Sequence, residues 1–502
     1  MNPKTTILLF SLAVLTLTGG CTRKKTSLAW EKDLFRIGSE SSPRATDLNG
    51  DGILDIVMGA GENEYQPSKL GVLALDGASG EIIWQQASKD QVFGSASFYD
   101  ITGDGLKDIF IGGRSNQLKA LDGKTGSLLW EYVYHYEDDP VLKYARFNFY
   151  NSIVIPDQNG DGLDDLFTVT GGNLKAKPYD ESDRYPGVLM VIDIKTGQIL
   201  AADTMPDGKE SYMSPLCFAQ PGRDELTIIF GSGGETISGN LYMAKLPDLM
   251  SKNLSRARII ASENGHGFIA PPAAADINGD GLYDIIAISH ASTVFAVNGL
   301  DSTLIWKNKI DNTESSNSFS VGYFTDDRIP DFFTFVSKGQ WPQSTGSVQV
   351  MIDGSNGNIA YMDSMGCTGF SSPVVYDLNH DGREEAIISI NEYDCNRGFT
   401  DTSPLNIENK LIAIDFAARS FFTIDQLKNF KNIFSTPWIG DLDHDKYLDI
   451  VYCQYYSSSP DLLIFLGMKV KCVSTHVRAE IPPAWGAYMG SGGNGIFPVN
   501  GE

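Results

Sequence analysis

The stretch Asp47-Leu-Asn-Gly-Asp-Gly-Ile-Leu-Asp55 decides the fold. It places oxygen-bearing side chains at positions 1, 3, 5 and 9 of a nine-residue loop, and its glycines suit a tight loop that needs positive φ. Convergent oxygen donors suit a hard cation, Ca²⁺ rather than Zn²⁺. Without a cation each carboxylate pair repels by roughly 3 kcal/mol at about 5 Å and an effective dielectric near 20. We therefore expect the metal to be part of the fold.

This acidic loop recurs along the chain. Five further copies keep the frame, and they begin at Asp100, Asp157, Asp276, Asp377 and Asp441. Two degenerate copies fill the gaps: 217–225 keeps only Glu225, and 323–331 keeps Asp327 and Asp331. Successive loops begin 47 to 64 residues apart, which is the period of a repeat protein.

Each complete loop supplies calcium ligands from the side chains at positions 1, 3, 5 and 9 and from the carbonyl at position 7. Thr102 is a poorer donor than Asn or Asp, and Lys446 replaces a glycine in the last loop. Up to six Ca²⁺ sites are predicted. The assigned ligands are Asp47, Asn49, Asp51, Ile53 and Asp55; Asp100, Thr102, Asp104, Leu106 and Asp108; Asp157, Asn159, Asp161, Leu163 and Asp165; Asp276, Asn278, Asp280, Leu282 and Asp284; Asp377, Asn379, Asp381, Arg383 and Glu385; and Asp441, Asp443, Asp445, Tyr447 and Asp449.

Strand patterns surround the loops. An apolar, β-rich run follows each loop, and then come two runs joined by an Asp-Gly-x-x-Gly turn, as in 72–84 and 118–130. About four short strands repeated eight times predict an all-β fold, a single β-propeller over residues 28–502. Eight blades are favoured and seven are the alternative. Leu28-Ala-Trp30 looks like the end of a blade that the C-terminus begins, which would close the ring.

Three tryptophans, Trp84, Trp130 and Trp306, end their hairpins at equivalent places. They could form an aromatic platform for sugars or pack between blades, and their regular recurrence favours packing. Five cysteines remain after Cys21, an odd number. An oxidising compartment permits Cys367–Cys395 or Cys453–Cys472 disulfides, and buried free thiols are the alternative.

The N-terminus reads as a targeting segment. Residues 1–20 combine Lys4, a short apolar run and small residues before Cys21. Leu17-Thr-Gly-Gly-Cys21 resembles the box of bacterial lipoproteins, which implies lipidation at Cys21 and a tether over 21–27. Plain secretion is the alternative. Thr22 in place of Asp favours an outer-membrane anchor, facing the periplasm or the surface. The net charge of −24 and the lack of a basic stripe exclude nucleic acid as a partner.

The acidic loops and their strands resemble FG-GAP/VCBS repeats, the calcium-loop blades also found in integrin α-chain propellers. The Ala-Leu-Asp-Gly-x-x-Gly-x-x-x-Trp turns resemble the blade motif of quinoprotein (PQQ-type) propellers, and together the two resemblances cover roughly residues 28–470. Integrin propellers have seven blades and quinoprotein propellers eight. A quinoprotein dehydrogenase would be expected to carry adjacent cysteines, and this chain has no Cys-Cys pair. The second resemblance therefore concerns structure alone.

Neither HExxH nor Gly-x-Ser-x-Gly occurs, and no catalytic or organic cofactor-binding residue is assigned. We expect a monomeric, calcium-stabilised propeller lipoprotein of the bacterial envelope that binds a protein or glycan partner without catalysis. One alternative is a polysaccharide-active enzyme resembling rhamnogalacturonan lyases, with candidate groups in the loops 135–146 and 175–184. Another is an outer-membrane assembly scaffold, by resemblance to quinoprotein-like assembly lipoproteins.

Overall fold

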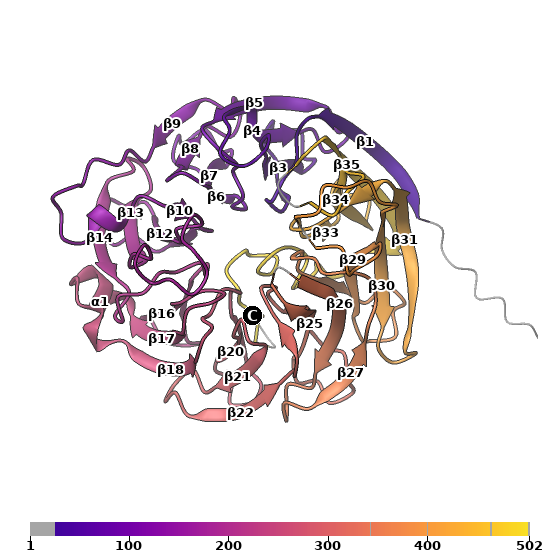
Figure 1. The fold of residues 1–502 in the computed structure, drawn as a ribbon. Helices are drawn as coiled ribbons and strands as arrows, with labels where there is room; N and C mark the ends of the chain where they lie inside the picture. The colour runs from indigo at the N-terminus through magenta and orange to yellow at the C-terminus, as the bar shows by residue number, and fades with distance from the viewer. Residues whose placement is uncertain (1–25, 342, 399, 462–463, 500–502) are drawn as a thin grey trace, which may run out of the picture.

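A computed structural model describes residues 26–341, 343–398, 400–461 and 464–499. Its strands form eight antiparallel sheets arranged as the blades of a closed ring (Figure 1). The predicted all-β propeller is therefore confirmed, with eight blades rather than seven. The predicted signal segment, Cys21 and most of the predicted tether lie outside the described residues. Within those residues, none of the helices has the length and apolar character needed to cross a membrane.

Each blade runs from a short inner strand to a longer outer one, and three inner strands are split in two. Blades 1 to 4 comprise β2 (Arg44–Thr46), β3 (Asp55–Gly59), β4 (Ser68–Leu75), β5 (Ile82–Ser88); β6 (Ser97–Tyr99), β7 (Asp108–Gly112), β8 (Leu118–Leu121), β9 (Leu128–Glu131); β10 (Asn148–Phe149), β11 (Ile153–Ile155), β12 (Asp165–Gly171), β13 (Val188–Asp193), β14 (Ile199–Thr204); and β15 (Leu216–Ala219), β16 (Leu226–Gly231), β17 (Gly239–Lys245), β18 (Arg258–Glu263).

Blades 5 to 8 comprise β19 (Ala273–Ala275), β20 (Asp284–Ile288), β21 (Thr293–Val297), β22 (Leu304–Lys309); β23 (Thr313–Glu314), β24 (Ser320–Gly322), β25 (Asp331–Gln340), β26 (Gln343–Ile352), β27 (Ile359–Asp363); β28 (Val374–Tyr376), β29 (Glu385–Glu392), β30 (Glu408–Asp415), β31 (Ser420–Lys428); and β32 (Phe430–Lys431), β33 (Trp438–Gly440), β34 (Tyr447–Tyr456), β35 (Gly467–Arg478), β1 (Ser27–Phe35). The helical elements are α1 (Leu246–Met250) and the 3₁₀ turns η1 (Leu142–Tyr144) and η2 (Leu254–Arg256).

The first and last strands of the chain close the ring. β1 supplies the outer strand of blade 8 and pairs antiparallel with β35, with Trp30 opposite Cys472 and Phe35 opposite Gly467. The prediction that Leu28-Ala-Trp30 completes a blade begun by the C-terminus is confirmed, and the strand starts at Ser27, one residue before the expected boundary. Pairing between chain ends ties the ring shut because both ends must separate before it can open.

Neighbouring blades pack face to face. Strands such as β3 and β20 are buried at every position, because both faces of a blade are covered by its neighbours. The recurrent tryptophans bridge these interfaces. The indole Nε1 of Trp84 donates to the Gly123 carbonyl of the next blade at 2.7 Å, and Trp306 donates likewise to Gly354 at 2.8 Å. Their predicted role in packing between blades is confirmed.

The strand order gives the ring two different faces. The acidic loops join the first and second strands of a blade, so they share one face with the hairpin turns between the third and fourth strands. We call this the acidic face. The connections between the second and third strands and between successive blades emerge on the opposite side, which we call the loop face. The hydrogen bond from Gly77 N–H in a hairpin turn to Asp55 in an acidic loop, at 3.0 Å, fits this division.

The C-terminal segment, residues 479–499, enters the middle of the ring (Figure 1). It leaves β35 at the acidic face, where Ala479 N–H donates to Lys446. It then meets inner strands of several blades: Val375 N–H donates to Trp485, and Ala274 N–H donates to Gly495 at 2.8 Å. Arg44, buried on β2, donates to the carbonyls of Tyr488 and Gly490.

The structure confirms one of the two disulfides that the sequence permitted. Cys367 and Cys395 form a disulfide. Cys217, Cys453 and Cys472 are free and buried, so the alternative Cys453–Cys472 bond is absent although both side chains belong to one core cluster.

Candidate functional sites

The acidic loops are tightly wound by their own side chains. In the first loop, Asp47 accepts from the N–H groups of Gly50 at 2.7 Å and Gly52 at 3.0 Å. Asn49 accepts from Asp51 N–H, and Asp51 accepts from Ile53 N–H, both at 2.8 Å. The glycines have the expected positive φ, 78° at Gly50 and 87° at Gly52. The loop is therefore organised as an oxygen-lined turn by its own hydrogen bonds.

The closing acid at position 9 has a second role that the sequence reasoning missed. Asp55 is buried and accepts from Leu48 N–H at 3.0 Å as well as from Gly77 N–H. Asp331, in the degenerate loop 323–331, makes the equivalent bonds with Phe324 and Gly354, both at 3.0 Å. At Asp55, Asp108, Asp284 and Asp331 the closing acid thus ties the loop to the hairpin turn of its blade, which gives Asp331 a structural role in a loop where most ligand positions are lost.

Burial sets the protonation of these closing acids. Desolvation raises the pKa of Asp55 to about 6 and of Asp284 to about 7, although backbone N–H donors to each carboxylate act in the opposite direction. Neighbouring loop carboxylates add to the increase. A bound cation would offset this repulsion.

The last loop brings three carboxylates together. Asp441, Asp443 and Asp449 each place an oxygen within 4.8 Å of the other two. Asp441 Oδ1 is buried and has no hydrogen-bond partner in the described structure. Lys446, which replaces a glycine, adopts φ of 71° and donates its N–H to Asp441 at 3.1 Å, so the substitution leaves the loop wound as in the other copies. An all-oxygen donor set with one unsatisfied oxygen fits a hard divalent cation.

The loop face carries buried arginine–glutamate ion pairs. Arg114 lies between Glu40, at 3.0 Å, and Glu64. Burial raises the pKa of Glu64 to about 7, although the Arg114 guanidinium acts to lower it. Further round the ring, Arg184 pairs with the buried carboxylate of Glu210.

The two loops proposed as catalytic candidates separate in the structure. The loop 175–184 lies over the loop face: Lys175 Nζ is 4.7 Å from the centre of the Tyr65 ring in blade 1, and Tyr179 N–H donates to Thr236 in blade 4 at 3.1 Å. Residues 136–142 instead lie against the outer strand β14, where they line a cavity of about 410 Å³. Arg146 and Tyr144 of the first loop stack on the ring of Tyr185, the residue that follows the second loop, at 4.8 Å and 6.1 Å from the ring centre.

Comparisons with known proteins agree on the architecture. Neither a protein-family model nor a curated protein sequence matches the chain. Among solved structures, a europium-containing methanol dehydrogenase is 12% identical, with a TM-score of 0.57 over 89% of this chain and 93% of its own. A quinohemoprotein alcohol dehydrogenase from Pseudomonas putida HK5 is 11% identical, with a TM-score of 0.54 over 91% of this chain and 77% of its own. BamB from Moraxella catarrhalis is 12% identical, with a TM-score of 0.49 over 89% of this chain and 97% of its own.

At such identities the likenesses to the two dehydrogenases show the propeller fold alone and say nothing about chemistry. The FG-GAP/VCBS resemblance, the calcium sites and the lipid anchor therefore stay predictions.

Proposed function

We propose that the chain is a calcium-stabilised β-propeller lipoprotein of the bacterial envelope that binds a protein or glycan partner through its loop face, without catalysis. Three features support this proposal: the difference between the acidic face and the loop face, the pairing of the polar groups at the loop face, and the donor set of the acidic loops. The membrane anchor depends on residues 17–21 of the sequence alone.

The observation that carries the proposal is the asymmetry of the ring. The C-terminal segment enters the middle of the ring from the acidic face, whereas the loop face presents side chains from several blades. Tyr65 is 47% exposed and Tyr179 75% exposed, and Lys175 lies beside Tyr65. Tyrosine offers a large apolar surface with a polar tip, which makes it a common anchor in binding surfaces.

The paired state of the polar groups speaks against a lyase. β-Elimination needs a base that can take a proton from the sugar. Arg184, Glu210 and Tyr212 are the closest arrangement to such a set, but Tyr212 already donates to Glu210 at 3.0 Å. Burial, followed by the adjacent Glu210 carboxylate, raises the pKa of the Tyr212 phenol. The Tyr212 phenol therefore stays protonated and is a poor base. The Arg184 guanidinium is already paired with Glu210 and is not free to bind a substrate carboxylate.

Asp441 supports the calcium part of the proposal. Asp441 has a buried carboxylate oxygen without a partner, and one of its oxygens lies within 4.8 Å of oxygens from two further carboxylates; this arrangement is costly unless a cation joins them. The other complete loops present the same backbone frame with Asn or Thr at position 3.

A glycan array run beside an absorbance assay for lyase products on acidic polysaccharides tests the function. Selective binding without product is expected, and Tyr65→Ala and Tyr179→Ala should each weaken it by about tenfold, roughly 1.4 kcal/mol. Phe421→Ala is the matched control, since Phe421 is 48% exposed but lies on the outer strand β31. If no glycan binds, the same variants are compared in pull-downs of envelope proteins. Product formation, or equal loss in the control, would contradict the proposal.

A further inference from the structure

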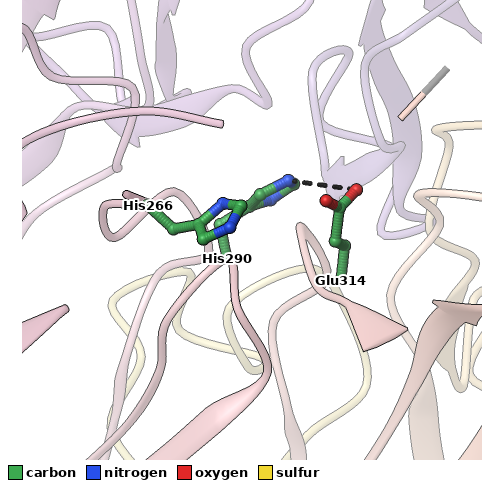
Figure 2. Close-up of side chains that lie close together, drawn as sticks. All are labelled: His266, His290 and Glu314. Atoms are coloured by element: carbon green, nitrogen blue, oxygen red, sulfur yellow. Dashed lines mark ion pairs between the residues drawn. The ribbon is translucent and has the colours of Figure 1, made fainter. Parts of the chain in front are cut away.

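A second kind of metal-binding geometry lies on the loop face, away from the acidic loops. His266 belongs to the connection between β18 and β19, His290 to the turn between β20 and β21, and Glu314 to β23 (Figure 2). One ligand atom from each side chain lies within 4.8 Å of the other two. Nε2 of His290 is 3.6 Å from Glu314 Oε2. Three successive blades, 4, 5 and 6, meet at this point.

Both imidazoles are held so that the same nitrogen is free. Nδ1 of His266 lies 2.6 Å from the Glu235 carbonyl, and Nδ1 of His290 lies 3.0 Å from the Ser315 carbonyl. A carbonyl oxygen only accepts hydrogen bonds, so each Nδ1 carries the proton. Each neutral ring therefore has its lone pair on Nε2. A backbone carbonyl that fixes the tautomer in this way is the usual support of a metal-binding histidine.

The surroundings of His290 leave this lone pair unsatisfied. The residue is 4% exposed, and its Nε2 has no hydrogen-bond partner in the described structure. An ion pair with Glu314 would be the simpler role, but at 3.6 Å the two atoms are too far apart for a good hydrogen bond. An ion pair also requires His290 to be protonated at Nε2, and it does not explain why His266 lies close to the same two residues.

The carboxylate and the space beside it suit a single ion. Trp341 N–H donates to Glu314 Oε2 at 2.7 Å, which fixes the carboxylate on the side facing His290. A cavity of about 10 Å³ adjoins the two buried ligands, and Glu235 also lines it. That volume is close to the minimum for one water molecule. The site has room for an ion with one further small ligand, and not for an organic cofactor.

We propose that His266, His290 and Glu314 bind one divalent transition-metal ion, of which Zn²⁺ fits best. Two imidazole nitrogens and one carboxylate oxygen form a borderline donor set that Zn²⁺ prefers and Ca²⁺ does not. Water or the exposed Glu235 carboxylate would take the remaining position. The ion would fasten the loop-face connections of blades 4, 5 and 6 to one another, while the oxygen-only acidic loops take calcium. The chain would then carry two classes of metal site, one on each face.

Calorimetric titration of the whole chain with Zn²⁺ tests this site. The protein is first treated with chelator and dialysed, and the titration is run in millimolar Ca²⁺ so that the acidic loops are saturated. Wild type is expected to bind one tight equivalent of Zn²⁺. His266→Gln and Glu314→Gln should each weaken that binding by at least about tenfold. His135→Gln is the matched control, because His135 also lies 2.8 Å from a backbone carbonyl but stands outside the cluster.

Co²⁺ substitution supplies an independent readout, since its visible absorption reports nitrogen and oxygen ligands directly. The spectrum should be lost in His266→Gln and kept in His135→Gln. His266 is partly exposed, so its variant is expected to fold, and circular dichroism checks this. No tight zinc in wild type, or equal binding by folded His266→Gln and wild type, would overturn the assignment.

Discussion

Asp331 Oδ1 accepts a hydrogen bond from the backbone N–H of Gly354 at 3.0 Å, and this link joins an acidic-loop position to a hairpin turn in a blade whose loop has lost most of its calcium ligands. The same link joins Asp55 to Gly77 and Asp108 to Gly123, each at 3.0 Å. The closing acid is thus a structural residue of the blade in addition to its proposed place among the calcium ligands.

Removing this link should destabilise the propeller without involving a metal. Asp331→Ala leaves the N–H groups of Phe324, Thr325 and Gly354 without their acceptor. Each buried orphan costs about 1–3 kcal/mol, so we expect a loss of roughly 3 kcal/mol or more in the free energy of unfolding. Urea unfolding in the presence of chelator measures it. Asp327→Ala, at an exposed position of the same loop, should cost less than about 1 kcal/mol, and equal losses would refute the assignment.

The C-terminal segment should depend on Arg44. Its buried guanidinium donates to the Tyr488 and Gly490 carbonyls, and burial lowers its pKa to about 10. In Arg44→Ala these carbonyls lose a charged donor, which should cost about 2–4 kcal/mol. Limited proteolysis with chymotrypsin should then cut after Trp485 and Tyr488 sooner than in wild type. Arg36→Ala, at an exposed arginine, is the control, and an unchanged cleavage rate in Arg44→Ala would contradict the anchoring role.

Glu384 should make stability depend on pH. Burial raises the pKa of this carboxyl to about 7, despite the N–H bond from Tyr323. The folded state therefore holds its proton more tightly than the unfolded state, and this group's stabilising contribution falls as pH rises from about 4.5 to about 7. Glu384→Gln keeps the acceptor and removes the ionisation. It should match wild type at pH 4 and exceed it by about 1–2 kcal/mol at pH 8. Urea unfolding in chelator at both pH values checks this, and a difference independent of pH would contradict it.

Repetition made the architecture predictable. The recurring loop fixed the period, and the hairpins ending in Trp84, Trp130 and Trp306 fixed the blade pattern. Leu28-Ala-Trp30 showed the closure, because its strand pattern had no partner nearby in sequence. Local patterns of this kind survive in a single sequence since each blade repeats the same local chemistry.

The remaining features depend on contacts between distant segments. His266, His290 and Glu314 come from separate connections and follow no ligand spacing, so only the ring brings them together. The path of residues 479–499 was equally hidden, because a turn-rich segment carries no strand period and its partners lie on inner strands across the ring. The structural hydrogen bonds of the closing acids were not predicted, because the same residues had been interpreted only as calcium ligands.

The central claim is that the chain binds calcium. The most direct test is its metal content, measured by mass spectrometry after dialysis in millimolar Ca²⁺, together with thermal melts before and after chelation. We expect several bound Ca²⁺ per chain, up to six, and one fewer in the double variant Asp441→Asn/Asp443→Asn. The melting temperature should fall markedly in chelator, since each site at a hundredfold its Kd adds about 2.7 kcal/mol. A calcium-free chain that melts at the same temperature in both buffers would contradict it.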